Sequence, residues 1–385
     1  MKFLHLADLH LGKRVNDFSM IEDQEFILNQ ILEIAENEKI DATVIAGDVY
    51  DKSTPNEQAV SLLDSFLVSL SNLKIKVFLI AGNHDSAERL SFGCRLMEAS
   101  GLHISKAYDG KIETTALEDD YGKINFYLLP FIKPAHIRSI FNKETETYTE
   151  AVNEALKQIN LNKNERNVLI THQFVTGSSK CDSEDFSVGG SDNVDSWVFD
   201  DFDYVALGHI HSPQKIGRET LRYSGTPLKY SFSECNHKKS ACLVEMNEKG
   251  NIKINLIPLK PLHDMREIKG KFSDILTGKE AGVKNSSIED YLHITLTDEN
   301  DIPDALARLR LVYPRIMKLD YDNERTRNSL SAQMTVSLQK KSPVEIFSDF
   351  FETQNGNSMN ENQYNFINNL INSILAKDEH SSSVE

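Results

Sequence analysis

The stretch Lys76–Arg89, which reads KVFLIAGNHDSAER, decides the fold class of this chain. Its apolar run ends in Gly82, and Asn83, His84 and Asp85 follow directly. An apolar run of this length before turn residues is typical of a strand that is buried on both faces. Open α/β sheets present chemical groups where their strands end, and Gly82 would let the backbone turn sharply there. Taken alone, the stretch is explained slightly better by a strand followed by an ordinary polar turn.

The same arrangement, an apolar run that ends in polar residues, occurs four more times in the chain. Helical spacing of apolar residues between the first runs predicts helices over 21–38 and from Thr54 onward. The order β-α-β-α-β is typical of a layered α/β domain. The additional predicted strands, each with the polar residues that follow it, are 2–6 with Asp8 and His10, 42–45 with Asp48, 168–170 with His172, and 204–207 with His209 and His211.

The second helix has the clearest start signal. We expect Thr54 to be its N-cap, Pro55 to occupy the first helical position, and Glu57 to complete a capping box. Further along, two strands are predicted within 111–131 and an amphipathic helix over 151–159.

The polar residues at the strand ends predict a metal site. We expect them to converge, because the ends of the strands in a layered α/β fold lie along one edge of the sheet. Carboxylate, imidazole and amide oxygen together suit Mn²⁺, Fe²⁺ or Zn²⁺. Their number suits two ions, with Asp48 as the bridging carboxylate. A single histidine at a strand end is more often structural, but five such ends in one chain make coincidence improbable.

Composition limits the classes of function. No stretch has the length of apolar sequence that a membrane span needs, and the N-terminus is not a signal peptide, so we expect a cytoplasmic protein without a membrane partner. The net charge is −16, from 42 basic and 58 acidic residues. Proteins that hold nucleic acid by themselves usually have a basic face. Either the substrate is not a polyanion, or bound cations and a partner supply the positive field.

Changes in composition predict the domain limits. Residues 1–261 contain all the polar strand ends and form the first predicted domain. A small β-α-β pattern over 291–296, 304–312 and 317–321 indicates a separate α+β domain at 262–340. Helical periodicity returns at 341–376, and residues 377–385 are expected to be disordered.

The order D-x-H, G-D, G-N-H-D, H and G-H-x-H along the chain resembles the calcineurin-like metallophosphoesterase superfamily. The flanking stretches LADLHLGKR, GNHDSAERLSFG, THQFVTG, DYVALGHIH, RYSGTPLKYSFSE and PVEIFSDFF are similar to the bacterial SbcD family, a branch related to the Mre-type repair nucleases. The similarity runs from residue 1 to about residue 376. It implies a layered metallophosphoesterase β-sandwich flanked by helices, a small α+β capping domain at 262–340, and C-terminal partner-docking helices at 341–376.

The resemblance also implies roles for the site residues. His84 would not bind metal but would act on the scissile phosphate, and Asp85 would be structural. Asp51 lies where relatives carry a second active-site histidine, so its role is left open. The implied ligands are Asp8, His10, Asp48 and His211 for one Mn²⁺, and Asp48, Asn83, His172 and His209 for the other.

The implied activity is that of a Mn²⁺-dependent DNA nuclease, a 3′-5′ double-strand exonuclease and a single-strand and hairpin endonuclease. It would act in DNA repair, recombination and replication with an SbcC-type coiled-coil ABC ATPase, as a homodimer within a heterotetramer. The partner would then supply much of the contact with DNA. An alternative is a two-metal small-molecule phosphatase or nucleotidase on the same scaffold, although such an enzyme does not need a cap and a helical tail. A non-catalytic subunit is disfavoured because no ligand position is missing.

Overall fold

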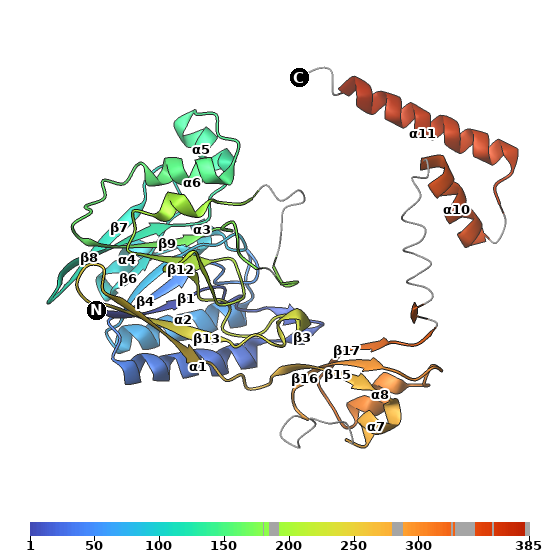
Figure 1. The fold of residues 1–385 in the computed structure, drawn as a ribbon, viewed down its shortest axis with the longest axis horizontal. Helices are drawn as coiled ribbons and strands as arrows, with labels where there is room; N and C mark the ends of the chain where they lie inside the picture. The colour runs from blue at the N-terminus through green and yellow to red at the C-terminus, as the bar shows by residue number, and fades with distance from the viewer. Residues whose placement is uncertain are drawn as a thin grey trace. The chain divides into compact units, whose positions relative to one another are not determined.

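The computed structural model describes residues 1–179, 181–184, 192–278, 288–324, 326–327, 343–355 and 358–381. Its main feature is a pair of six-stranded β-sheets with helices on both sides (Figure 1). This is the layered α/β sandwich that the sequence predicts, and the fold class is therefore confirmed.

The first sheet combines a parallel centre with an antiparallel edge. Strands β1 and β4 pair in parallel, as do β4 with β5 and β5 with β6, whereas β13 pairs with β1 and β14 in the antiparallel sense. In spatial order the strands are β14 (Ile252–Pro258), β13 (Ser240–Met246), β1 (Lys2–Leu6), β4 (Ala42–Ala46), β5 (Lys76–Ile80) and β6 (Leu102–Ile104).

The second sheet has the same design. Strands β8, β9, β10 and β12 are parallel, and β7 and β11 add antiparallel edges. In spatial order the strands are β11 (Gln214–Ile216), β12 (Arg218–Tyr223), β10 (Tyr204–Gly208), β9 (Arg166–His172), β8 (Gly122–Leu129) and β7 (Glu113–Asp119).

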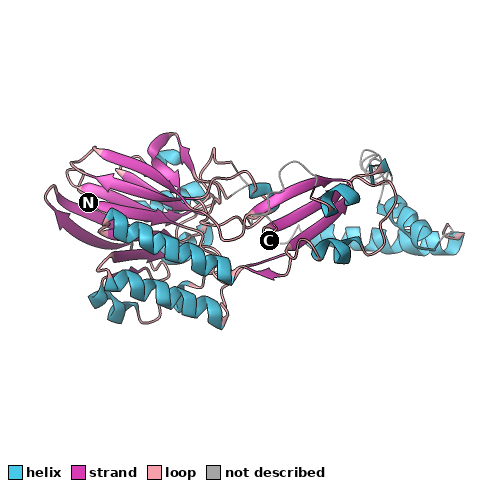
Figure 2. Cartoon of the chain, turned by 90° about the horizontal axis from the view of Figure 1, so that it is seen from below, coloured by secondary structure: helices cyan, strands magenta, loops and turns pink. Residues whose placement is uncertain are grey.

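Apolar side chains hold these layers together. A core between the two sheets is built from alternate strand residues, and it includes Phe78 stacked on Phe126 with ring centroids 4.2 Å apart. Helices α1 (Ile21–Glu38) and α2 (Glu57–Asn72) cover the outer face of the first sheet, and α5 (Pro134–Phe141) and α6 (Tyr148–Leu156) cover that of the second (Figure 2). Residues that alternate along one strand therefore serve two cores, which explains the continuous apolar runs in the sequence.

The predicted start of α2 is wrong. The N-cap is Asn56, whose side chain accepts a hydrogen bond from the backbone N–H of Ala59 at 2.8 Å. Thr54 and Pro55 lie before the helix, and Thr54 accepts a hydrogen bond from Arg89 instead. Asn is as good an N-cap as Thr, so the local sequence holds two competing caps and tertiary contacts select the second.

Several short elements have no strong sequence signal and were not predicted. These are β2 (Arg14–Val15), β3 (Phe18–Ser19), α3 (Ala87–Leu90), α4 (Cys94–Met97), the 3₁₀ turns η1 (Glu98–Ser100), η2 (Ser196–Phe199) and η3 (Phe232–Glu234), together with β6, β11, α5 and β14.

The region after residue 261 contains a three-stranded sheet in the order β15 (Met265–Gly270), β16 (Tyr291–Leu296) and β17 (Ile316–Tyr321), with α7 (Phe272–Leu276) and α8 (Ala305–Arg310). The predicted β-α-β pattern corresponds to β16, α8 and β17, whereas β15 and α7 were missed. By contacts the chain divides into a unit of residues 1–295 and 302–320 and a unit of residues 296–301 and 321–385. The domain limits proposed from the sequence stay a prediction.

Two helices, α10 (Pro343–Asn355) and α11 (Glu361–Ser381), belong to the second unit. Helix α11 continues past residue 376, where the sequence predicted that order would end, and residues 382–385 lie outside the described residues. In the described part of the chain, no helix combines the length and the apolar character that crossing a bilayer requires.

Candidate metal centre

The polar residues that end five strands lie together, but not along the edge of a single sheet. Asp8 and His10 follow β1, Asp48 follows β4, and Asn83 follows β5, all in the first sheet. The remaining three come from the second sheet, with His172 as the last residue of β9 and with His209 and His211 after β10. The expectation of one sheet edge is therefore wrong, because the site is built where the ends of two stacked sheets face each other.

Three glycines allow this close approach. A Cβ atom on Gly82 would lie 2.1 Å from Oδ1 of Asp48, and one on Gly208 would lie 1.8 Å from the carbonyl oxygen of Ala46. A Cβ atom on Gly47 would lie 2.5 Å from Nδ1 of His172. Gly82 does not have a positive φ, so it is needed for close packing and not for the sharp turn that the sequence suggested.

Backbone conformation also marks the site. Four candidate ligands have a positive φ, a region that non-glycine residues rarely occupy. The values are 54° for Asp8, 44° for His10, 47° for Asp48 and 105° for His209. Strained residues of this kind persist where the surrounding structure holds them, and they are typical of functional sites.

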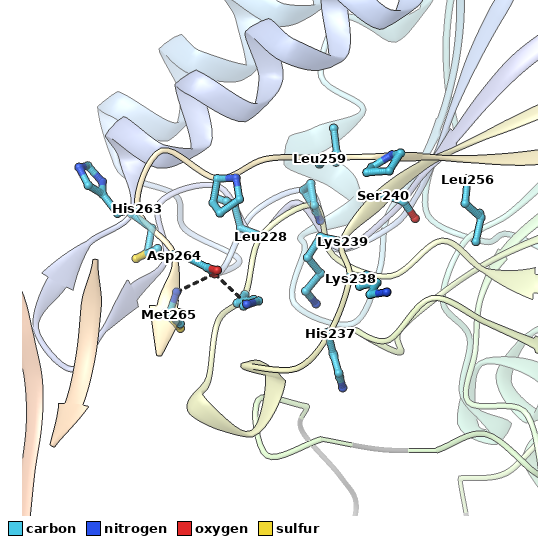
Figure 3. Close-up of a pocket in the computed structure, with 15 residues that line it drawn as sticks. Leu228, His237, Lys238, Lys239, Ser240, Leu256, Leu259, His263, Asp264 and Met265 are labelled. Atoms are coloured by element: carbon cyan, nitrogen blue, oxygen red, sulfur yellow. Dashed lines mark hydrogen bonds and ion pairs between the residues drawn. The ribbon is translucent and has the colours of Figure 1, made fainter. Parts of the chain in front are cut away.

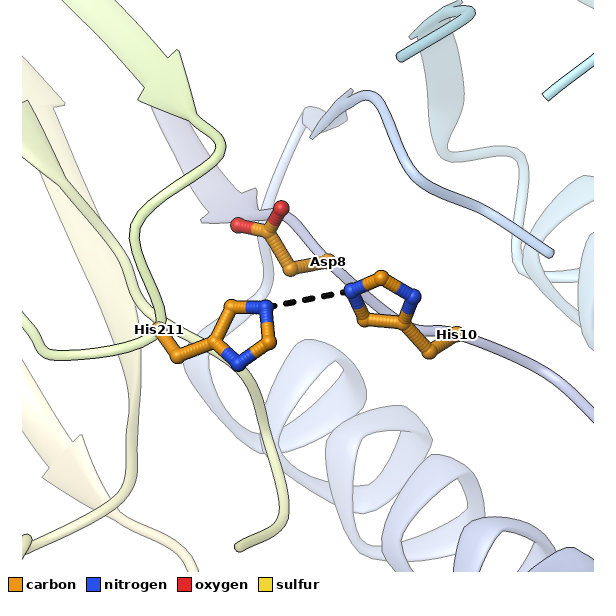
Figure 4. A group of neighbouring side chains, drawn as sticks. All are labelled: Asp8, His10 and His211. Carbon is orange, nitrogen blue, oxygen red and sulfur yellow. Dashed lines mark hydrogen bonds between the residues drawn. The ribbon is translucent and has the colours of Figure 1, made fainter. Parts of the chain in front are cut away.

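One part of the cluster consists of Asp8, His10 and His211 (Figure 4). The two imidazole Nε2 atoms lie 3.2 Å apart, and each of the three residues offers a ligand atom within 4.8 Å of the others. All three side chains are buried. Nδ1 of His10 has no hydrogen-bond partner among the described residues.

The other part centres on Asn83. Its Oδ1 lies 3.0 Å from Nε2 of His172 and 2.9 Å from Nδ1 of His209. Oδ2 of Asp48 lies 3.3 Å from Nε2 of His172 and 3.8 Å from Nε2 of His10. Asp48 therefore stands between the two parts, which is the position that a bridging carboxylate needs.

Burial and neighbouring charges shift the pKa values of the site histidines in opposite directions. Burial lowers the pKa of His10, and it lowers that of His209 to about 3, so both rings are neutral near pH 7, the form that binds metals. Burial alone would also lower the pKa of His172, but the charges of Asp48 and Asp8 raise it to about 9. The same carboxylates would attract a divalent cation, so the donor set fits a metal ion of borderline to hard character.

Backbone groups hold several of these side chains in place. Nδ1 of His172 donates to the carbonyl oxygen of Ala46 at 2.8 Å, which directs Nε2 toward Asn83 and Asp48, where a cation would bind. The carboxylate of Asp8 accepts the backbone N–H of His209 at 2.9 Å. Asp85 accepts three backbone N–H groups, from Val49, Tyr50 and Gly82, at 2.9–3.0 Å. Asp85 thus ties two strand-end loops together, in keeping with the structural role favoured by the sequence.

His84 lies beside the cluster and is more exposed than the buried ligands. Its side chain is 19% exposed, against 1% for His10 and 3% for Asp48. Its Nδ1 lies 3.1 Å from the carbonyl oxygen of Asp51, and its Nε2 lies 3.9 Å from Oδ2 of Asp48. The Asp51 side chain is 2.7 Å from Nζ of Lys13 and 3.8 Å from Nδ1 of His10. Asp51 therefore contributes its backbone to His84 and its charge to the surroundings of His10.

Comparison with known proteins was informative at the level of sequence. Residues 1–213 match the calcineurin-like phosphoesterase family, and residues 261–355 match the family described as type 5 capsule protein repressor C-terminal domain. The SbcD subunit of the nuclease SbcCD from Staphylococcus epidermidis is 33% identical over 98% of this chain and 100% of its own length.

The chain belongs to the SbcD family of calcineurin-like phosphoesterases. It is therefore a phosphoesterase of a family that uses divalent metal ions, and the buried cluster offers groups that could hold such ions. Two solved structures were also matched. A dimetal phosphatase from Danio rerio is 12% identical, covers 68% of this chain and 98% of its own, and has a TM-score of 0.42. A protein from Thermus thermophilus is 10% identical, covers 66% and 98%, and has a TM-score of 0.39. Scores of this size add nothing to the fold described above.

Sequence reasoning missed the groups that surround His211 in this SbcD-family chain. They are Ser183, Glu184, Glu234 and Lys239, and all four form hydrogen bonds to His211 or to one another. The quoted stretch RYSGTPLKYSFSE contains Glu234, but nothing in its spacing indicates a contact with a strand end 23 residues earlier in the chain.

A separate cavity of about 370 Å³ lies away from the candidate ligands, none of which lines it (Figure 3). Its walls are largely apolar and include Leu228, Leu256 and Leu259, with Lys239 at one side. It contains none of the metal-binding groups, so its size does not make it the reactive site.

Proposed function

We propose that this chain is the nuclease subunit of an SbcCD-type complex, a Mn²⁺-dependent enzyme that cuts DNA phosphodiesters. The activities proposed are 3′-5′ exonuclease action on double strands and endonuclease action on single strands and hairpins, in DNA repair, recombination and replication. The supporting observation is that the match to the SbcD subunit of a nuclease SbcCD spans 98% of this chain. The similarity therefore includes the region after residue 261 as well as the metal cluster.

We assign the first ion to Asp8, His10, Asp48 and His211, and the second to Asp48, Asn83, His172 and His209. The support is geometric. Asp8, His10 and His211 lie close enough to hold one ion, and Asn83 lies within 3.0 Å of His172 and His209. Oδ2 of Asp48 lies 3.8 Å from His10 and 3.3 Å from His172, between the two sets. The mixture of carboxylate, imidazole and amide donors suits Mn²⁺. Bound divalent ions would polarise the phosphate and activate the attacking water.

His84 is proposed as the residue that acts on the phosphate. Its exposure exceeds that of the buried ligands His10 and Asp48, and its Nδ1 is engaged by the carbonyl oxygen of Asp51. An N–H at Nδ1 that donates to this oxygen fixes the orientation of the ring, with Nε2 3.9 Å from Oδ2 of Asp48. An imidazole can stabilise charge on the phosphate or protonate the leaving oxygen.

A cleft beside Asn83 supports a substrate larger than a simple phosphate ester. It measures about 560 Å³ and is lined by Asn83, Phe131, Lys133 and His136, among others. Consecutive phosphates of a nucleic-acid strand lie close together along its backbone. Lys133 and His136 would therefore contact the phosphate next to the one that is cut. We propose that this cleft receives the DNA strand next to the bond that is cut.

The C-terminal helices are proposed to dock on the coiled coil of an SbcC-type ABC ATPase. Phe350, Phe366 and Leu370 are large apolar side chains that are 59%, 68% and 45% exposed. Exposed apolar side chains close together on helices are typical of a surface that a partner covers. A partner that carries much of the DNA contact would account for the net charge of −16.

A homodimer within a heterotetramer is proposed as the working assembly. Phe92, between the short helices α3 and α4, is 83% exposed, and Leu96, within α4, is 84% exposed. These two side chains would suit contact with a second copy of the chain. Because the proposed substrate is bacterial DNA, the proposed place of action is the cytoplasm.

The decisive experiment compares two substrates. The purified chain, alone and with an SbcC-type partner, is assayed in Mn²⁺ on a duplex oligonucleotide and on a small phosphomonoester. We expect Mn²⁺-dependent cleavage of the oligonucleotide at a far higher kcat/KM than hydrolysis of the monoester. The reverse preference would favour the alternative, a two-metal small-molecule phosphatase or nucleotidase, and would overturn the proposal.

A further inference from the structure

His211 is held by side chains at three points besides its proposed metal-binding atom. Its backbone N–H donates to Oε1 of Glu184 at 2.6 Å. Its carbonyl oxygen accepts from Nζ of Lys239 at 2.9 Å. Its Nδ1 lies 2.7 Å from Oγ of Ser183. Three side chains from other parts of the chain therefore hold both the backbone and the ring of His211 in place.

The contact with Ser183 fixes the position of the ring proton. Oγ of Ser183 lies 2.6 Å from Oε1 of Glu234, and a carboxylate can only accept a hydrogen bond. Ser183 therefore donates its proton to Glu234 and accepts from Nδ1–H of His211. With the proton at Nδ1, Nε2 of His211 carries a lone pair, and it faces Nε2 of His10 (Figure 4).

Glu234 is the last group in this series of hydrogen bonds, and its surroundings favour the ionised carboxylate. The side chain is fully buried, and Lys239, itself almost fully buried, forms an ion pair with it. Its Oε1 also accepts the backbone N–H of Tyr230 at 3.2 Å. Nζ of Lys239 further donates to Oγ1 of Thr226 at 2.6 Å. A buried charge is tolerated only when it is paired and hydrogen-bonded in this way.

We propose that Ser183 and Glu234 are positioning residues that hold His211 in the tautomer with Nε2 free, and so raise the affinity of the first metal ion. This rests on the proposed function, because it takes His211 as a ligand of that ion. Two segments thereby gain a role in the site. They are 231–234, which reads SFSE and contains Glu234, and 181–184, which contains Ser183. Partners of this kind usually change metal affinity by about 10–100-fold.

The test uses the full chain with Ser183→Ala, which removes the bridge between Nδ1 and Glu234. Mn²⁺ binding is measured by titration calorimetry on chelator-treated protein. We expect the affinity of one of the two sites to fall about 10–100-fold. Ser183→Thr, which keeps a hydroxyl, should restore most of it. The matched control is Ser179→Ala in the same loop, whose exposed hydroxyl forms no hydrogen bond with the described residues; its affinity should not change.

A second readout reports the tautomer itself. The metal-free chain is labelled with ¹⁵N-histidine, and the His211 signals are assigned as those lost in His211→Ala. In the wild type we expect the ¹⁵N shifts of an Nδ1–H tautomer, and in Ser183→Ala a shift toward the Nε2–H form. An unchanged spectrum together with Mn²⁺ affinity within twofold of the wild type would overturn the proposal.

Failure of the proposed function would look different. If His211→Ala binds both ions as the wild type does, His211 is not a ligand, and the metal assignment fails. If His211→Ala weakens binding while Ser183→Ala does not, the metal assignment stands and only the positioning role is lost. Thermal unfolding of each variant shows whether a loss of affinity merely follows from a loss of fold.

Discussion

At the scale of single residues, the neighbours Asn83 and His84 are proposed to have different roles, metal binding for Asn83 and action on the phosphate for His84. Asn83 lies between His172 and His209 in the buried cluster, whereas the ring of His84 lies beside the cluster and is more exposed. His84→Gln keeps a polar side chain of similar reach but removes the imidazole. We expect both metal ions to remain bound with affinities within about twofold, and the rate of DNA cleavage to fall about 10²–10⁴-fold.

Calorimetry with Mn²⁺ and a cleavage assay on the same preparation check this expectation. Asn83→Ala is the matched comparison in the same loop. It removes a proposed ligand, so its main effect should be a lower affinity for Mn²⁺. Cleavage by His84→Gln at the wild-type rate would show that this histidine has no catalytic part.

Another residue-scale prediction concerns stability and pH. The carboxyl of Asp119 is partly buried, which raises its pKa, but hydrogen bonds from the buried Arg166 and from the N-terminal ammonium of Met1 outweigh this and hold its pKa well below the ordinary value. A lowered carboxyl pKa stabilises the fold fully above the unfolded value of about 3.9, and the stabilisation is lost as the pH falls toward the folded value. Asp119→Asn leaves the Arg166 charge without its carboxylate, so we expect unfolding to become easier by about 3 kcal/mol at pH 7.

Urea unfolding of the wild type and Asp119→Asn at several pH values measures the effect. The difference in unfolding free energy should be constant from pH 8 to about pH 5 and should shrink once the pH falls below about 4. A difference that stays constant down to pH 3 would mean that the Asp119 charge is not the source of the stabilisation.

At the scale of elements, Asp23 joins helix α1 to the strand β16. It is completely buried, and it accepts hydrogen bonds from the backbone and Nδ1 of His263 at 3.1 and 3.0 Å and from the hydroxyl of Tyr291 at 2.8 Å. Asp23→Ala leaves one buried and two partly buried donors without this acceptor. We expect a loss of about 2–4 kcal/mol and faster exchange of the amide protons in β16, because each unsatisfied donor carries a desolvation cost.

Hydrogen exchange followed by mass spectrometry measures the exchange of amide protons in α1 and in β16 separately. The exposed Glu25, two residues further along α1, provides the control variant Glu25→Ala. If exchange in β16 is unchanged by Asp23→Ala, these hydrogen bonds do not hold the two elements together.

The elements also show what the sequence could predict. Every candidate ligand ends or follows a run of apolar residues, a local pattern, and so all seven could be proposed from the sequence, and the structure brings their side chains together. The facing of two sheets was not predicted, because it depends on strand pairing across long distances in the chain. The same limit applies to Ser183 and Glu234, which approach His211 from segments with no strong local signal. The N-cap of α2 was misplaced for the opposite reason, since Thr54 and Asn56 are both adequate caps.

At the scale of the whole molecule, the C-terminal helices and the metal cluster are predicted to be separable. Helices α10 and α11 belong to a different unit from the two six-stranded sheets, and several of their large apolar side chains, including Phe350 and Phe366, are exposed. Deleting residues 342–385 should therefore leave the melting temperature of the sheets and the Mn²⁺ affinity unchanged. The shortened chain should no longer co-purify with an SbcC-type coiled-coil ATPase, because the proposed apolar docking surface is gone.

A point variant tests the proposed apolar docking surface without removing residues 342–385. Phe366→Glu places a charge on α11 at a side chain that is 68% exposed, so the helix itself should tolerate it. A charge in an apolar interface is costly, so binding of the ATPase should fall at least tenfold in a pull-down titration. Glu361→Ala, at the start of the same helix, is the control and should bind normally. If both the deletion and Phe366→Glu retain full binding, the ATPase docks elsewhere, and the exposed phenylalanines pack against another part of this chain.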